Sequence, residues 1–224
     1  MQRQVDLASP AGTREVLIVT AERLYATHGI DRVSLRQIGE AAGRRQTAAV
    51  QYHFGDVDGL LRAVVEFRTR AANERRTEML DDIVLAGRQD DVHALLEAVA
   101  FPLLETLPAD SHYLGFVAEL QARRRIAPIF TEPGTEYGEN ARRISRYLDD
   151  ALVDIPVELR RRRIERAIEL LLTSLARDWE PGVRRRGGDV STDLLVADLL
   201  GSTAAMLRAP VPSAAPRPSR KRSS

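Results

Sequence analysis

The chain has 224 residues, of which 44% are hydrophobic, enough for one large or two modest domains with a sizeable buried core. Its 33 Lys and Arg residues nearly balance its 32 Asp and Glu residues, which disfavours a protein that coats nucleic acid indiscriminately and confines any DNA contact to a local patch. The absence of cysteine excludes disulfides, thiolate metal sites and cysteine nucleophiles.

The chain also lacks signals for membranes or export. No apolar run approaches the roughly 20 residues that span a bilayer, and the first ten residues have no apolar segment of the kind found in secretory signals. We therefore expect a soluble, cytoplasmic protein without a membrane partner.

The first predicted helix covers residues 13–28. Thr13 is a suitable N-cap, and Glu15 suits the positive end of the first turn. Leu17, Leu24 and other apolar residues fall on one face. Gly29 follows the helix and can adopt the left-handed conformation that ends it.

A short second helix has the clearest start signal in the chain. Ser34 and Gln37 form a capping box, while Val33 and Ile38 form a hydrophobic staple. Gly43 ends this helix after about two turns. A third short helix follows, in which residues 50 and 54 point inward. This order is typical of a helix-turn-helix.

The rest of the chain also shows helical periodicity and no stretch of strand alternation. Asp56 caps a helix that reaches Ala71 and either continues or breaks before Ile83. Further helices are predicted over residues 91–107, 111–124, 136–152, 156–179 and 191–207, with Pro102 kinking the first of these. Residues 127–134 and 180–189 are predicted loops.

These elements predict an all-α fold with an N-terminal three-helix helix-turn-helix domain and a C-terminal helical domain for ligand binding and dimerisation. The predicted organisation is a flexible arm over residues 1–12, the helix-turn-helix over 13–55, the helical domain over 56–208 and a tail over 209–224. The tail is rich in Pro, Ser, Ala and Arg, so we expect it to be disordered.

The N-terminal segment resembles the DNA-binding region of the tetracycline-repressor (TetR) family. The matching pieces are "THG", "VSLRQIGEAAG", "VQYHFG" and "GLL", in this order between residues 13 and about 61. The C-terminal region matches only in its length and helical pattern. The resemblance implies a dimeric, ligand-responsive transcriptional regulator whose third helix enters the major groove of DNA.

If Val50 and Phe54 face inward in such a helix, the helical periodicity places Ala48 and Tyr52 on the opposite, outward face. Gln51 can pair with an adenine edge, and the small Ala48 allows close approach to a thymine methyl. The candidates for DNA contact are Ser34, Arg36, Arg44, Arg45, Gln46, Thr47, Ala48, Ala49, Gln51, Tyr52 and His53.

Each DNA-contact candidate also has a purely structural interpretation. Ser34 caps a helix whatever else it contacts, Tyr52 and His53 can pack against the next helix, and the Arg44–Arg45 pair can be an ordinary solvated turn.

Two departures from the family pattern bear on these contacts. The turn after Gly43 is one residue longer than the usual spacing, which leaves the start of the recognition helix open. Val57 stands where the family usually has a basic residue, between two acids that suit helix capping but repel phosphate.

A helix-turn-helix monomer reads few base pairs, so we expect a homodimer on a palindromic operator of double-stranded DNA. The two final long helices carry broad apolar stripes suited to a four-helix bundle with the partner, although the stripes can equally be intramolecular core. The candidate interface residues are Ile164, Ile168, Leu171, Leu172, Leu175, Trp179, Val196, Leu199, Leu200, Thr203 and Leu207.

Helices between residues 60 and 152 are expected to enclose a site for a small-molecule effector of unknown identity. The candidate ligand contacts are His93, His112, Tyr113, Phe116, Glu119 and Tyr137, each of which also suits core packing or solvated surface. His112 and Glu119 have no recognised metal-site spacing, so we expect neither a metal nor a cofactor. The arginine runs at 123–125, 160–163 and 184–186 are interpreted as solvated.

No paired His/Glu metal motif, glycine-rich phosphate loop or nucleophile elbow is present, so we predict that the protein is not an enzyme. The predicted function is a sequence-specific repressor that a small molecule releases from its operator. The alternatives left open are a helical-bundle enzyme and a helix-turn-helix used only for protein contacts.

Overall fold

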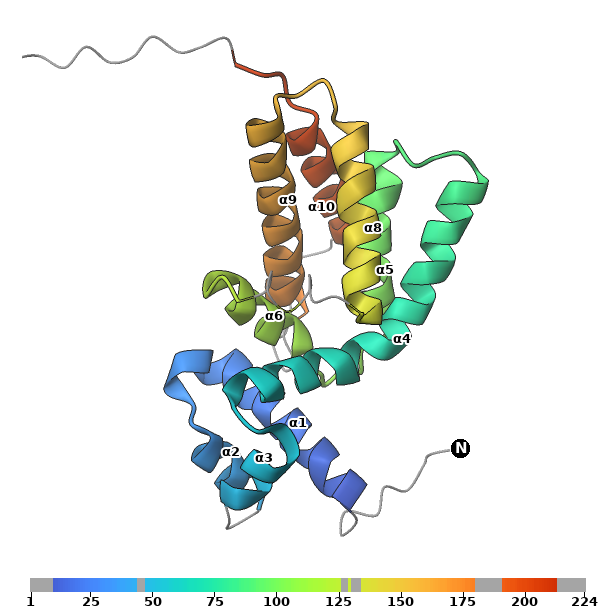
Figure 1. The fold of residues 1–224 in the computed structure, drawn as a ribbon. Coiled ribbons are helices and arrows are strands. Elements are labelled where there is room, and N and C mark those ends of the chain that lie inside the picture. The colour runs from blue at the N-terminus through green and yellow to red at the C-terminus, as the bar shows by residue number, and fades with distance from the viewer. Residues whose placement is uncertain (1–9, 44–46, 126–128, 130–133, 180–190, 213–224) are drawn as a thin grey trace, which may run out of the picture.

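The computed structural model describes residues 10–43, 47–125, 129, 134–179 and 191–212, and this part of the chain is helical without a strand (Figure 1). The predicted all-α fold is confirmed. The helices are α1 (Pro10–His28), the 3-10 helix η1 (Ile30–Arg32), α2 (Leu35–Ala41), α3 (Thr47–Phe54), α4 (Val57–Leu85), α5 (Val92–Thr106), α6 (Tyr113–Ala122), α8 (Glu136–Ala151), α9 (Val157–Asp178) and α10 (Thr192–Leu207).

The first helix starts earlier than the sequence predicts. Thr13 does not cap it, because α1 already begins at Pro10. Proline suits the first helical turn, where the N–H that it lacks would have no acceptor within the helix. The predicted end is confirmed: Gly29 follows α1 with a φ of 87°, in the left-handed region that glycine adopts at little cost.

The second helix begins as predicted. Ser34 accepts a hydrogen bond from the backbone N–H of Gln37, and the Gln37 side chain accepts one from the backbone N–H of Ser34 at 2.9 Å. Both members of the predicted staple are inside the molecule, with Val33 buried and Ile38 fully buried. The capping box therefore fixes where α2 begins, while the buried Ile38 marks the face of α2 that packs inward.

A single long helix, α4, connects the two parts of the molecule. It begins after Asp56, whose side chain accepts a hydrogen bond from the Gly59 N–H at 2.7 Å, and it continues without a break through Ile83. Its first half lies beside α1 and α3, and its second half turns along α5 and α8 (Figure 1). Movement of α4 therefore affects both ends of the molecule.

Helix α5 runs through Pro102 without leaving its buried backbone unpaired. Proline has no N–H to donate to the carbonyl of Ala98, four residues earlier. Arg76 of α4 replaces this donor, with its Nε 2.9 Å from the Ala98 carbonyl oxygen. The α4–α5 contact is thus anchored by a side chain that compensates for the proline.

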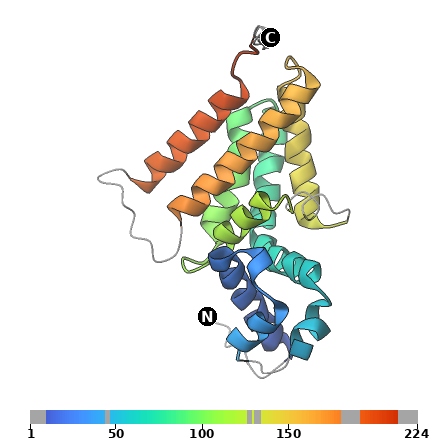
Figure 2. The same ribbon diagram turned by 90° about the vertical axis from the view of Figure 1, so that its left-hand side faces the viewer.

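Helices α5, α8, α9 and α10 stand together above the N-terminal helices, and α6 lies between the two groups (Figures 1 and 2). Helices α9 and α10 pack side by side, and Leu171 and Leu175 of α9 and Leu200 of α10 are buried. Among the residues that the structure describes, no helix is long and apolar enough to cross a membrane.

The predicted solvated arginine run on α9 is wrong for two of its members. Arg160 is only 11% exposed and pairs with Asp149 at 2.7 Å. Arg163 is buried and donates hydrogen bonds to the carbonyls of Leu207, Ala209 and Pro210 at the end of α10. At the end of a helix, the carbonyls have no N–H donor further along the helix. Arg163 supplies donors to these carbonyls, which explains why a buried arginine is stable there.

Candidate nucleic-acid interface

Helix α3 has the inward and outward faces that the sequence predicts. Val50 is fully buried and Phe54 packs partly against the core, which fixes the rotation of the helix. On the opposite face Tyr52 is 85% exposed, and Gln51 beside it is exposed as well. A large aromatic side chain this exposed contributes little to folding and is accessible to a partner.

The rings at the end of α3 support one another. Tyr52 and His53 meet edge to face with their ring centroids 5.3 Å apart, and His53 lies 5.9 Å from the ring of Phe54. The guanidinium of Arg14 from α1 lies over the Phe54 ring at 5.5 Å. His53 is thus half-buried and held between its neighbours, while Tyr52 does not pack against the next helix.

Ser34 and Arg36 lie on the exposed surface at the start of α2, but both already have partners. The Ser34 hydroxyl lies 2.8 Å from the side-chain oxygen of Gln37, to which it donates, so a phosphate contact would require that bond to break. Arg36 is 73% exposed and pairs loosely with Glu40 at 3.6 Å. An ion pair this exposed contributes little, so Arg36 is readily available to a phosphate.

The remaining predicted DNA contacts lie at the turn. Arg44, Arg45 and Gln46 are outside the described residues. Thr47, Ala48 and Ala49 form the first turn of α3, which places the start of this helix at Thr47. The structure thus shows where the recognition helix begins, which the sequence left open. The DNA contacts of the residues at this turn stay predictions.

The tight turn between α3 and α4 was not predicted from the sequence. A Cβ atom on Gly59 would lie 2.0 Å from the carbonyl oxygen of Phe54, so only glycine fits there. Gly55 between the two helices has a φ of 74°. The signal was present in the sequence as "FGDVDG", whose two glycines and capping acid at residue 56 permit this tight turn.

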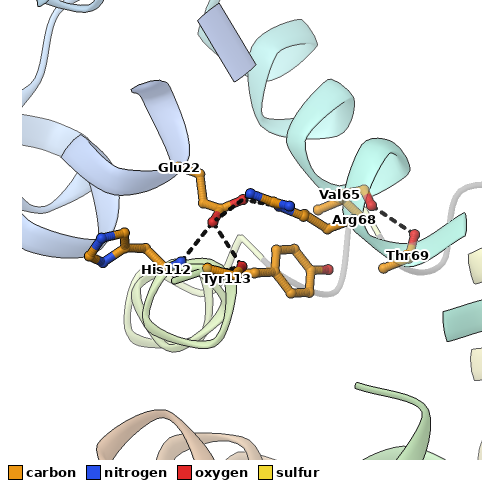
Figure 3. Close-up of polar contacts among 7 residues, drawn as sticks. Glu22, Val65, Arg68, Thr69, His112 and Tyr113 are labelled. Atoms are coloured by element: carbon orange, nitrogen blue, oxygen red, sulfur yellow. Dashed lines mark hydrogen bonds and ion pairs between the residues drawn. The ribbon is translucent and has the colours of Figure 1, made fainter. Parts of the chain in front are cut away.

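Glu22 joins α1 to both α4 and the start of α6. No signal in the sequence indicated these contacts. Its carboxylate is 1% exposed and accepts hydrogen bonds from Arg68 Nε at 2.5 Å, from the Ser111 hydroxyl at 3.0 Å and from the His112 backbone N–H at 2.8 Å (Figure 3). We call these four residues the Glu22 cluster. A buried carboxylate with this many donors is stable only while all three helices stay in place.

A second pair of contacts ties the far end of α6 to the N-terminal helices. Arg123 pairs with Asp31 of η1, and Arg125 pairs with Asp58 of α4 at 2.9 Å. The arginine run at 123–125 is solvated as predicted, because Arg123 is 39% and Arg125 is 40% exposed, although both also form ion pairs with the N-terminal helices. Asp58 is held by Arg125, while Asp56 caps α4 as predicted.

The six predicted ligand contacts have different surroundings, although Tyr113 and Phe116 lie together with their ring centroids 6.1 Å apart. Tyr113, Phe116 and Tyr137 are buried, whereas His93 lies on the surface beside Glu97. Periodicity shows which residues share a helix face, but it does not show which neighbouring helix that face meets, so it could not predict these positions.

The other two predicted ligand contacts face the N-terminal helices. Glu119 pairs with Arg123 and lies against Gly29, and His112 belongs to the Glu22 cluster. Among the described residues, no group of three His, Cys, Asp or Glu residues is arranged to hold a metal ion.

Most of the predicted dimer residues are occupied within the protomer. The buried ones are Leu171, Leu172, Leu175, Val196, Leu200, Thr203 and Leu207. The intramolecular alternative therefore accounts for these seven, because α9 and α10 pack against each other and against α6 and α5. Ile164, Ile168, Trp179 and Leu199 are only partly buried, so these four retain surface for a partner.

Comparison with known proteins matches the N-terminal helices to a family of DNA-binding regulators. The model of the family described as "Bacterial regulatory proteins, tetR family" matches residues 17–64, from α1 into the first part of α4. This segment contains the exposed face of α3. Residues 17–64 are a DNA-binding region of the tetR family.

Two curated relatives extend the likeness beyond the helix-turn-helix. The HTH-type transcriptional repressor AcnR of Corynebacterium glutamicum is 24% identical over 174 residues, which cover 75% of this chain and 84% of the relative. The protein of the same name from Corynebacterium efficiens has the same identity and coverage. The likeness therefore includes the C-terminal helices, where the sequence pattern alone offered no motif.

Proposed function

We propose that this protein is a homodimeric tetR-family repressor that binds a palindromic operator and is released by a small-molecule effector. The observation that carries the proposal is the exposed Tyr52, on a helix anchored from behind by Val50 and Phe54. An outward tyrosine beside an outward glutamine supplies donors for phosphate and base edges, as a recognition helix requires. Both curated relatives carry the name of transcriptional repressors.

Dimerisation is supported by an exposed face on α9 and α10. Leu170 is 42% exposed and Leu194 is 59% exposed, although both belong to helices that are otherwise packed. Ala197 and Gly201 follow Leu194 on the same face of α10 and are exposed as well. Small residues beside exposed leucines let a partner helix approach closely, so we place the dimer interface on this outer face rather than on the inner stripe.

Release by an effector requires a connection between the upper helices and α1, and the Glu22 cluster supplies one. An effector that shifts α4 or the start of α6 must move Glu22 with it or leave a buried charge without partners, which is costly. A typical coupling of about 1–3 kcal/mol weakens operator binding by about five- to 150-fold. The two α3 helices of a dimer then no longer match successive major grooves.

Selection of bound fragments from random DNA, followed by gel shifts with the DNA that flanks the protein's own gene, tests this function. We expect the enriched sequence to contain two inverted half-sites whose centres lie about one DNA turn apart. If the folded dimer gives no sequence-specific shift at moderate salt, the operator-binding function is wrong and the helix-turn-helix serves protein contacts.

A further inference from the structure

Arg14 of α1 places a positive charge beside the end of α3. The carbon at the centre of its guanidinium lies 5.5 Å from the centroid of the Phe54 ring, so this contact joins the two helices. Arg14 is half-buried, and within the described part of the chain no carboxylate forms an ion pair with it. Its charge is therefore not used to hold the described helices together.

The contact with Phe54 positions the guanidinium without using its hydrogen-bond donors. The face of an aromatic ring attracts the charge as a whole, so the five N–H groups of the planar fork are not consumed. Arg68 shows the alternative, because it lies over the Phe67 ring at 5.2 Å while Glu22 accepts from its donors. Arg14 has the same support from a ring but no such acidic partner.

A row of rings connects Arg14 to the exposed face of α3. The Phe54 ring that carries the guanidinium lies 5.9 Å from the ring of His53, which in turn lies 5.3 Å from the ring of Tyr52. Tyr52 is 85% exposed. The first turns of α1 lie at the same lower end of the molecule as α2 and α3 (Figure 1). The charge of Arg14 is thus held next to the surface that is proposed to meet DNA.

The junction between α3 and α4 needs such a charge if it approaches DNA. Asp56 caps α4 and Asp58 lies in its first turn, and both carboxylates would repel a phosphate. Asp58 is paired with Arg125 at 2.9 Å, and Asp56 accepts from the Gly59 N–H. Arg14 approaches the same junction from α1, through Phe54, and supplies a cation there.

We propose that Arg14 binds a phosphate of the operator backbone beside the end of α3. The inference rests on the proposed operator binding and adds a contact from α1, outside the segment between residues 34 and 53 to which the sequence assigned DNA contacts. A phosphate fits because it accepts two parallel N–H bonds from a guanidinium fork. A guanidinium already held over a ring also loses less freedom on binding than a free side chain does.

Fluorescence anisotropy of the full chain with the selected operator, over a series of salt concentrations, tests the contact. Each neutralised phosphate contributes about 0.9 to the slope of log affinity against log salt. A dimer loses two contacts, so we expect Arg14→Gln to reduce this slope by about 1.8 and operator affinity by about a hundredfold. An unchanged slope would overturn the assignment even if affinity falls, because Arg14 would then only support α3 through Phe54.

Affinity for DNA of unrelated sequence gives a second readout. A phosphate contact carries no sequence information, so Arg14→Gln is expected to weaken operator and unrelated DNA by similar factors. A loss confined to the operator would show that the substitution disturbs the base contacts of α3, and it would contradict a phosphate contact.

Two variants serve as controls. Arg146→Gln is matched to Arg14→Gln, because Arg146 lies over the Tyr147 ring at 5.3 Å but belongs to α8, among the upper helices (Figure 1). It removes the same charge and the same kind of ring contact, and we expect it to keep the wild-type salt slope. Arg14→Lys retains the charge, so we expect it to keep most of the slope that Arg14→Gln loses. Equal slopes in Arg14→Gln and Arg146→Gln would refute the contact.

Replacement of single operator phosphates by neutral methylphosphonates locates the contact. We expect one position in each half-site at which the replacement weakens binding of the wild type but not of Arg14→Gln. If Arg14→Gln fails to fold, Arg14→Lys takes its place, and the replacement should then cost less than in the wild type. Absence of such a position would contradict the inference. A folded wild type that binds no operator would instead contradict the proposed function, so the two failures are distinguishable.

Discussion

Replacement of Glu22 by glutamine tests whether a buried charge holds the DNA-contacting helices to the rest of the molecule. Glutamine has almost the same shape, but one of its two terminal groups is an NH₂ donor. In the native protein both carboxylate oxygens face donors: one lies 2.5 Å from Arg68 Nε, and the other lies near the Ser111 hydroxyl and the His112 N–H. Either orientation of the amide therefore places a donor against a donor.

The expected cost follows from the burial of the pair. Glu22 is 1% exposed and the Arg68 side chain is 12% exposed, so Glu22→Gln leaves the arginine charge without its partner in a largely dry site. Removing one member of a buried ion pair typically costs about 3–5 kcal/mol. Part of that cost comes from the Ser111 and His112 donors, which lose an acceptor.

Urea denaturation followed by circular dichroism at a fixed protein concentration measures the change. Glu105→Gln is the matched control, because Glu105 is 47% exposed and pairs with Arg75 at 2.9 Å. Exposed pairs contribute about 0–1 kcal/mol, so the control is expected to unfold close to the wild-type midpoint. Equal destabilisation by the two substitutions would refute the role assigned to the Glu22 cluster.

Three further substitutions test other parts of the fold. Gly59→Ala places a Cβ 2.0 Å from the Phe54 carbonyl oxygen, so we expect it to lower stability by about 1–3 kcal/mol in urea denaturation, and an unchanged midpoint would contradict the close approach. Arg163→Met leaves the carbonyls of Leu207, Ala209 and Pro210 without a donor, so we expect faster amide exchange at the end of α10, and unchanged exchange would show that the arginine does not hold this helix. Burial raises the pKa of Tyr25 to about 12, so folded protein binds this proton more tightly than unfolded protein does and stability falls as pH rises from about 10 to about 12. The loss is about 1.4 kcal/mol for each pH unit in that window, and urea denaturation at each pH should show Tyr25→Phe losing less stability than the wild type.

The sequence predicted those features that depend on local chemistry. The capping box at Ser34 and the glycine after α1 are decided within a few residues, so they could be read from the printed sequence. The rotation of α3 was equally predictable, because Val50 and Phe54 are one turn apart and Tyr52 lies opposite them.

Features that depend on distant residues could not be predicted in the same way. Glu22 and Ser111 are 89 positions apart, and nothing in the chemistry of either one indicates the other. An apolar stripe on α10 likewise has the same pattern whether it faces α9 or a second protomer, so Leu200 was assigned to the dimer interface while it is buried inside. Burial against a named neighbour, not periodicity, decides between such alternatives.

The affinity of the Tyr52→Ala dimer for the selected operator tests the central claim most directly. Tyr52 is 85% exposed, so its removal should leave folding and dimerisation intact, and Leu85→Ala, at an 86% exposed position at the end of α4, is the control. A hydrogen bond to a phosphate is worth about 1.5–3 kcal/mol and is lost once in each protomer, so we expect operator affinity to fall by about a hundredfold or more. Wild-type affinity in Tyr52→Ala would show that α3 does not present this face to DNA.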